Sequence, residues 1–203
     1  MPPEYRSLGC LPADQFIPAL MKKLDLSYYA ALLTAAQYYG AAHQRPQEFQ
    51  VLVDRRRRSL SCGKVRVVFM VRKNAADVPV QPFNTPRGTL LVSTPEATAV
   101  DLVGYHKQAG GLNQVATVLA ELAERIDPHK LPAAAESAPI PWAQRLGYLL
   151  EHIGAAEKTG DLRAYVEEQA RESTALLPGE SYENAPGDAS WKLYINAAVE
   201  TQL

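Results

Sequence analysis

Two carboxylates near the middle of the chain are the first residues whose types suggest chemistry. Glu96 and Asp101 stand in the stretch LLVSTPEATAVDLVGY, where an apolar strand pattern changes within a few residues into a helical one. Paired carboxylates carry general acid–base catalysis or bind divalent metal ions. A helix turns about 100° per residue, so carboxylates five positions apart point to different faces. An unusual hydrolase would therefore need Glu96 and Asp101 to act with groups from other elements.

The same residues have a structural explanation as a corner between a strand and a helix. Thr94 suits the N-cap position, because its hydroxyl can accept a hydrogen bond from the first helical turn. Pro95 suits the first helical position, and Glu96 suits the positive end of the helix dipole. Asp101 has apolar neighbours in the sequence, as expected of a buried acceptor that fixes a loop. We therefore assign Thr94, Pro95, Glu96 and Asp101 to a structural corner rather than to catalysis.

Other catalytic and cofactor patterns are missing from the sequence. Many metal-dependent nucleases place acid-x-Lys on a strand, but Val71 stands two residues before Lys73 and Ser190 two before Lys192. The four histidines have no Cys or His at ligand spacing, whereas a zinc site takes three or four such ligands. No GxSxG, GxxxxGK[ST] or GxGxxG motif occurs. The sequence predicts no catalytic residue, no metal site and no cofactor.

A run of four arginines is the strongest charge feature. It is reinforced nearby in the sequence by Arg45, Lys64, Arg66, Arg72 and Lys73. The run could be a solvated loop whose like charges prevent edge pairing, or a patch for phosphates or an acidic protein surface. The candidate residues for nucleic-acid or partner binding are Arg55, Arg56, Arg57, Arg58 and Arg66. The C-terminal third is acidic instead, a polarity that could guide association with a complementary partner.

Composition narrows the class of protein further. The 203 residues are 47% hydrophobic and 21% charged, with a formal net charge of -1, which is typical of a globular chain and argues against general nucleic-acid coating. Cys10 and Cys62 are too few for a disulfide framework, so we expect reduced thiols in a cytosol. The sequence contains no secretory signal and no apolar run of about 18 residues. A cytoplasmic location is expected.

Hydrophobic periodicity predicts an α+β (or α/β) fold with a small mixed or antiparallel sheet of about four strands and helices packed on it. The strands are expected at 48–54, 64–72, 88–94 and 190–196, where β-branched and aromatic residues gather. We expect residues 48–72 to form a hairpin with the arginine run at its tip. The expected helices are 12–24, 28–39, 95–107, 112–126, one beginning near Pro141, and one from Asp161 to about Glu172.

Several stretches occur in an order that resembles a known family. They are PPEYRSLGCLPADQFIPALMKKL, YYAALLTAAQYYGAAHQRPQEFQVLV, STPEATAVDLV, GGLNQVATVLAEL and QRLGYLLE, of which GAAHQRPQEFQV and STPEATAVDLV are the most specific. Together they resemble the C-terminal domain of the AbiEi family, the antitoxins of bacterial type IV toxin–antitoxin, or abortive-infection, systems. The resemblance covers most of the chain.

The resemblance implies a non-enzymatic antitoxin that counters an AbiEii-like nucleotidyltransferase toxin, without requiring a stable complex. Family members typically carry an N-terminal winged helix-turn-helix that binds and represses their own promoter, and the C-terminal domain assists through basic contacts. Here the segment that follows that winged helix begins almost at Met1. We therefore expect the winged helix to be missing. Without it, Arg55–Arg58 would have to supply any contact with DNA, including any aid to autorepression. An alternative role is a nucleic-acid-binding module that uses the same Arg55–Arg58 segment.

The resemblance also suggests a domain organisation. We expect residues 1–203 to form a single AbiEi-like domain. Within it, residues 1–45 would be an N-terminal helical segment and residues 128–141 an internal proline-rich connection.

Overall fold

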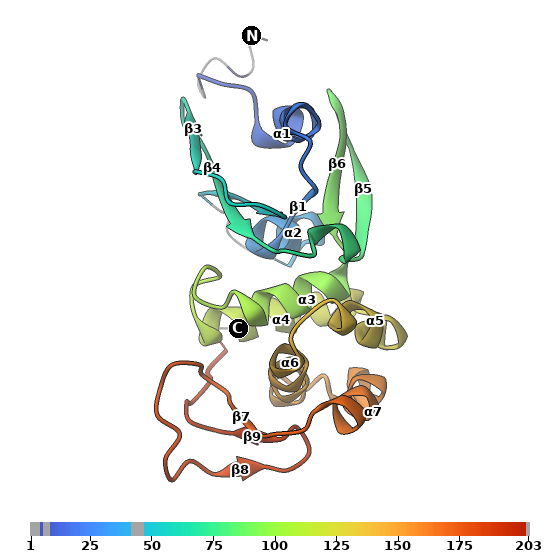
Figure 1. Cartoon of the computed structure of the whole chain (residues 1–203), viewed down its shortest axis with the longest axis vertical. Coiled ribbons are helices and arrows are strands. Elements are labelled where there is room, and N and C mark those ends of the chain that lie inside the picture. The colour runs from blue at the N-terminus through green and yellow to red at the C-terminus, as the bar shows by residue number, and fades with distance from the viewer. Residues whose placement is uncertain (1–4, 6–8, 42–46, 202–203) are drawn as a thin grey trace.

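The protein has a mixed α+β fold in which helices pack on a curved sheet, as Figure 1 shows. The computed structural model describes residue 5 and residues 9–41 and 47–201. The predicted fold class is confirmed, although the main sheet has six strands instead of about four. Its strands are β1 (Tyr28–Ala30), β2 (Phe49–Val53), β3 (Leu60–Cys62), β4 (Val65–Val71), β5 (Val80–Thr85) and β6 (Gly88–Ser93), in the order β3-β4-β2-β1-β6-β5.

The strand β1 occupies residues that were predicted to be helical. Residues 28–30 pair antiparallel with Val51–Val53, and Ala30 pairs parallel with Val92. The predicted helix over 28–39 is therefore wrong at its start, and the helix α2 covers only Leu32–Tyr38. A short aromatic and small-residue run fits either periodicity, so pairing with strands distant in the sequence decides its conformation.

The segment 48–72 was predicted to be one hairpin, and this prediction is wrong. β2 and β4 run parallel, with Phe49 level with Val67 and Val53 level with Val71. The hairpin consists of β3 and β4 alone, turning at Gly63, where φ is 56°. The arginine run therefore lies in the connection that leaves β2 and crosses to β3, and not at a hairpin tip.

The two faces of the sheet bury different sets of helices. Val51 and Val53 of β2 belong to a core that contains Ile17 and Met21 of α1 (Ala13–Leu24), while Leu52 belongs to the core beneath α2. This alternation follows from the two-residue repeat of a strand. In Figure 1, α1 lies between the β3–β4 and β5–β6 arms of the sheet, and the remaining helices lie beyond α2.

The second half of the chain is largely helical. Its α-helices are α3 (Pro95–Gly104), α4 (Leu112–Leu122), α5 (Leu131–Glu136), α6 (Ile140–His152) and α7 (Gly160–Gln169). Its 3-10 helices are η3 (Ala123–Arg125), η4 (Pro128–Lys130) and η5 (Ala156–Lys158), and a further one, η2 (Ala75–Asp77), precedes β5 in the first half. The proline-rich connection expected over 128–141 is thus ordered as η4, α5 and the start of α6. Prolines at the first positions of these helices explain this, because such positions have no helical partner for a backbone N–H.

The strand predicted at 190–196 does not join the main sheet. Residues 193–194 form β9 of a separate three-stranded sheet in the order β7-β9-β8, with β7 at Thr174–Ala175 and β8 at Gly187–Asp188. The predicted alternation holds for Trp191 and Leu193, which are buried, but they pack against α6 and α7. The expected organisation of residues 1–203, with its helical segment 1–45, stays a prediction; residues 1–4, 6–8 and 42–46 lie outside the described part.

Cys10 and Cys62 form a disulfide, so the expectation of two reduced thiols is wrong for this structure. Their Cα atoms lie 5.7 Å apart although the residues are 52 positions apart in the sequence. Spacing along the chain could not reveal this pair, because the curvature of the sheet brings β3 beside the segment before α1.

Within the described residues, no helix combines the length and the hydrophobicity needed to cross a bilayer.

Candidate functional site

The predicted corner at the end of β6 is held together by the residues assigned to it. The hydroxyl oxygen of Thr94 accepts a hydrogen bond from the backbone N–H of Ala97 at 3.3 Å, and Pro95 is the first residue of α3. The Glu96 carboxylate is buried and accepts a hydrogen bond from the backbone N–H of Asp127 at 2.9 Å. Glu96 therefore fixes the chain between η3 and η4.

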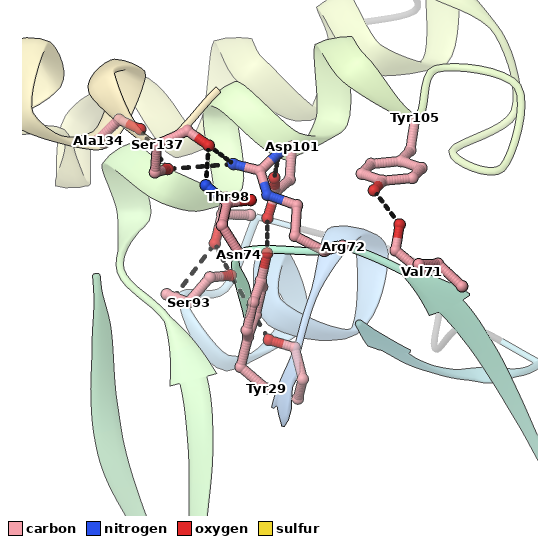
Figure 2. A network of polar contacts seen from close by, with 11 residues as sticks. Tyr29, Val71, Arg72, Asn74, Ser93, Thr98, Asp101, Tyr105, Ala134 and Ser137 are labelled. Carbon is pink, nitrogen blue, oxygen red and sulfur yellow. Dashed lines mark hydrogen bonds and ion pairs between the residues drawn. The ribbon is translucent and has the colours of Figure 1, made fainter. Parts of the chain in front are cut away.

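Asp101 lies at the centre of a buried polar junction between the sheet and the helices (Figure 2). Its Oδ2 accepts a hydrogen bond from the Tyr29 hydroxyl at 2.8 Å, and its Oδ1 lies 3.2 Å from Nη1 of Arg72. The Arg72 side chain is only 4% exposed. The interpretation of Arg72 as a residue that reinforces the exposed arginine run is wrong, because its charge faces a carboxylate inside the protein.

The rest of the junction ties Arg72 to the α5–α6 corner. Its Nη2 donates to the carbonyl oxygen of Ser137 at 2.9 Å and to the Ser137 hydroxyl at 3.0 Å. The Asn74 amide donates to the same carbonyl at 2.6 Å. The guanidinium also lies 4.8 Å from the ring centre of Trp142. One arginine thus connects the end of β4 with three helices, and we call this set of contacts the Arg72–Asp101 junction.

The environment of the junction favours a structural role for Asp101 over a role in proton transfer to or from a substrate. Burial raises the pKa of Asp101 to about 6, although the Arg72 charge and the Tyr29 hydrogen bond lower it in part. Burial also raises the pKa of the Tyr29 phenol, and the neighbouring carboxylate raises it further. A catalytic carboxyl must reach a substrate, but Asp101 has 0% of its surface exposed.

A groove of about 510 Å³ lies elsewhere, between α1, α2, the start of β2 and the β3–β4 turn. Its lining residues are Pro12, Ala13, Asp14, Thr34, Gln37, Tyr38, Gln47, Glu48, Phe49, Lys64, Val65 and Arg66. Neither Glu96 nor Asp101 belongs to it. The hydrolase hypothesis needed both carboxylates in one cleft, and each of them instead holds a different internal contact.

The candidate binding arginines do not form one continuous patch. Arg55–Arg58 are all exposed and follow the end of β2. Arg66 stands at the start of β4, where it pairs with Glu48 at 3.1 Å. Because β2 and β4 are parallel, Arg55 and Arg66 lie at opposite ends of this strand pair. Arg45 lies outside the described residues.

Two lysines that the sequence did not single out lie beside the arginine run. Nη2 of Arg55 donates to the backbone carbonyl of Asp25 at 2.7 Å, just after α1 ends. The exposed Lys22 and Lys23 occupy the last turn of α1. We call Lys22, Lys23 and Arg55–Arg58 the basic loop surface. Both lysines lie in the predicted helix 12–24, but nothing local indicates that this helix ends beside the loop after β2.

A buried glutamine is a second residue whose role the sequence did not reveal. Gln50 lies on β2, its amide oxygen accepts from the backbone N–H of Leu33, and its amide nitrogen donates to the carbonyl of Gln108. It supports the turn at Leu32, where φ is 53°, a value that residues other than glycine rarely adopt.

No group of three or more His, Cys, Asp or Glu side chains in the described part of the chain is arranged to hold a metal ion.

These features define an α+β domain in which the central carboxylate, Asp101, is buried and bonded within the fold, while the arginine run is exposed on the surface. Residues 29–152, more than half of the chain, match the family described as the AbiEi antitoxin C-terminal domain. The chain therefore belongs to the AbiEi antitoxin family, as the resemblance indicated. The matched region begins in β1, contains the Arg72–Asp101 junction and ends with α6.

Two solved structures are similar to this chain to different degrees. The crystal structure of the RV2827C protein from Mycobacterium tuberculosis superposes with a TM-score of 0.60 at 18% sequence identity, covering 89% of this chain and 67% of that one. An antigenic nucleotidyltransferase-like protein from Paracoccidioides brasiliensis gives a TM-score of 0.49 at 9% identity, with 76% and 90% of the chains covered. The first likeness shows the fold alone. A comparison with curated protein sequences gave no match.

Proposed function

We propose that this chain is a cytoplasmic, non-enzymatic antitoxin that counters an AbiEii-like nucleotidyltransferase toxin. The observation that carries the proposal is the family match over residues 29–152, which includes five strands of the main sheet in full and most of β1. Family membership supports a role in a toxin–antitoxin system. The identity of the toxin, the lack of enzymatic activity and the cytoplasmic location are the steps that we add. The proposal needs no stable complex with the toxin.

The burial of the ionisable groups supports a role that does not depend on catalysis. The carboxylates that could have served a reaction, Glu96 and Asp101, are both buried and already bonded within the chain. The cationic side chains of the basic loop surface are exposed, and of these Arg55 is also paired with Asp54. Such a distribution suits a protein that acts through surface contacts.

Co-expression with the toxin tests the proposal. Cells that produce an AbiEii-like nucleotidyltransferase toxin alone should stop growing, and cells that also produce this chain should resume growth. Colony counts with and without induction of the toxin measure the effect. Undiminished arrest in cells where the chain accumulates as a folded protein would contradict the proposed role.

A matched pair of variants keeps this test specific. Gly147→Ala should fail to protect, because the added methyl group collides with Trp191, whereas Gly160→Ala meets no atom within 4 Å and should protect fully. Both variants make the same chemical change in a helix of the second half of the chain. Equal protection by the two variants would show that rescue does not require the folded domain.

A second candidate function, nucleic-acid binding, is favoured by one observation. The hydrogen bond from Arg55 to the carbonyl of Asp25 places the arginine run next to the end of α1, whose last turn carries Lys22 and Lys23. Asp54, paired with Arg55 at 3.6 Å, offsets one of these charges. Clustered cations bind phosphates mainly through release of counterions, which makes the affinity depend strongly on salt. Such a surface would also suit an aid to transcriptional autorepression.

The expected result is salt-dependent binding of duplex DNA or of RNA that weakens when Arg55–Arg58 are all changed to serine. The plot of log affinity against log salt concentration has a negative slope, and each lost phosphate contact on duplex DNA should make this slope shallower by about 0.9. Fluorescence anisotropy at several salt concentrations measures this slope. The control changes Arg87, Lys107, Arg125 and Arg171, which are also exposed, and removes the same number of charges. Equal losses in both variants would exclude a specific role for the basic loop surface.

A further inference from the structure

A buried histidine with no role in the contacts described above lies in the turn between α3 and α4. His106 is only 6% exposed. Among the described residues, neither Nδ1 nor Nε2 of its ring has a well-formed hydrogen bond. Burying a polar group without such a partner is costly, and burying a charged one costs far more. The surroundings of the ring therefore suit the neutral imidazole and not the imidazolium ion.

The charged groups that act on the His106 ring are both cations. Arg145 of α6 is 7% exposed, and Lys107 is the next residue along the turn. Residues 112–120 at the start of α4 contain no ionisable side chain. A proton on the ring would thus add a positive charge where positive charge is already present.

The charge of Arg145 is itself not neutralised. Its Nε donates to the carbonyl of Ala175 at 2.9 Å and its Nη2 to the hydroxyl of Thr174 at 3.2 Å, and both acceptors are uncharged. Burial lowers the pKa of Arg145 to about 10, with no carboxylate in the described part of the chain opposing the shift. The two carboxylates of α3, Glu96 and Asp101, hold the internal contacts described above.

The turn that carries the histidine is fixed on several sides. The carbonyl of His106 accepts a hydrogen bond from the backbone N–H of Gly111 at 2.7 Å. The Tyr105 hydroxyl donates to a carbonyl at the end of β4 at 2.7 Å (Figure 2), and the Gln108 carbonyl accepts from the Gln50 amide at 3.0 Å. The backbone of the turn therefore has little freedom to carry the ring outward.

The proton affinity of the ring follows from these contacts. Burial lowers the pKa of the His106 imidazole from its usual value of 6.5. The Val103 carbonyl opposes this shift in part, and the charges of Arg145 and Lys107 add to it. An unfolded chain exposes the ring to water, so it takes up the proton more readily than the folded chain does.

We propose that His106 makes the fold sensitive to mild acid, because the folded chain holds this ring beside Arg145 in its neutral form. Protonation places a second positive charge in the same buried region, and the folded state loses stability relative to the unfolded state. The loss begins near pH 6.5, where a histidine in an unfolded chain takes up a proton. This property is independent of the proposed antitoxin role.

Two other groups respond to acid with the opposite sign. Burial raises the pKa of Asp101, and the hydrogen bond to Asp161 raises the pKa of His129. Both groups bind their proton more tightly in the folded state, so each of them favours folding as the pH falls. The effect of His106 has to be measured between proteins that share these two groups.

An NMR titration of the imidazole signals of the intact chain tests the proposal directly. The midpoint of His106 should lie below 6.5 and that of His129 above it, so one sample contains both directions of shift. The signals that disappear in His106→Gln and in His129→Gln assign the two rings. A midpoint of His106 at or above 6.5 would overturn the proposal.

Removal of the neighbouring cation tests the cause. Arg145→Met should raise the midpoint of His106, because one of the two positive charges that act on the ring is gone. Arg87→Met is the matched control, since it removes an exposed charge between β5 and β6 and should leave the midpoint unchanged. Equal midpoints in the two variants would overturn the pairing of cations on which the proposal rests.

Urea unfolding at pH 7 and at pH 5 measures the consequence for the fold. The folding equilibrium constant of the intact chain should fall relative to that of His106→Gln, by up to about tenfold for each pH unit below 6.5, the limit for one proton. Glutamine is also polar but does not titrate, and the contributions of Asp101 and His129 cancel because both proteins contain them. Parallel pH profiles of the two proteins would overturn the proposal.

Discussion

Replacing Arg72 by methionine is expected to lower the free energy of unfolding by about 3–5 kcal/mol, since this is the usual cost of leaving a buried charge without its partner. The variant keeps Asp101, whose side chain is 1% exposed, and removes the cation that lies 3.2 Å from it. It also leaves the Ser137 carbonyl without the donor from Arg72. Urea unfolding, followed by fluorescence of Trp142 and Trp191, measures the loss.

The pH dependence of this variant provides a second readout. Arg72 lowers the pKa of Asp101, so its removal should raise that pKa above the value of about 6 in the intact protein. A carboxyl whose pKa is higher in the folded than in the unfolded state favours folding when it is protonated. The stability lost in Arg72→Met should therefore be partly regained as the pH falls from about 8 to about 5.

Two further variants separate the charge effect from packing. Arg72→Met combined with Asp101→Leu removes both charges and should be clearly more stable than Arg72→Met alone, because no unpaired charge remains. Arg66→Met breaks the exposed pair with Glu48, in which Arg66 is 62% exposed, and should cost at most about 1 kcal/mol. Similar losses from Arg72→Met and Arg66→Met, or no pH dependence of the first, would contradict the role given to the junction.

Gly147→Ala is expected to destabilise the protein by about 3 kcal/mol or more, at or above the upper end of the usual cost of overpacking a core. A Cβ atom at this position of α6 would lie 2.0 Å from Cζ3 of Trp191, far inside van der Waals contact. Trp191 is fully buried, so its ring has no solvent-filled space into which to move. Thermal unfolding followed by circular dichroism measures the effect.

The cause can be checked by making room for the methyl group. Trp191→Leu alone removes a large buried side chain and should itself be destabilising. Combined with Gly147→Ala, it should cost less than the sum of the two single changes, because the collision is gone. Gly160→Ala, at the start of α7, should change the stability little. Strict additivity of the two changes at 147 and 191 would argue against direct contact as the cause.

Local sequence patterns were sufficient where an element depends on its own residues. The predicted strands 48–54, 64–72 and 88–94 correspond to β2, β4 and β6, and the corner at Thr94, Pro95 and Glu96 begins α3. Side-chain alternation and helix capping act over a few residues, so they can be read without the fold. The order of family-like stretches was likewise enough to identify the AbiEi antitoxin family.

The errors occur where the partner of a residue is distant along the chain. Residues 28–30 become β1 because they pair with β2 and β6, and the parallel pairing of β2 with β4 moves the arginine run away from a hairpin tip. The strand-like segment 190–196 similarly joins a second small sheet instead of the first. In each case the hydrophobic pattern of the segment was compatible with more than one neighbour.

The sequence by itself determined the class of fold, the strand-to-helix corner and the family of this protein. Only the tertiary structure decided that Arg72 is buried against Asp101, that Lys22 and Lys23 lie beside Arg55, and that Cys10 meets Cys62. The physical reason is that charges and thiols have no periodicity of their own. Their partners are chosen by how the sheet curves and how the helices pack, and those arrangements depend on the whole chain at once.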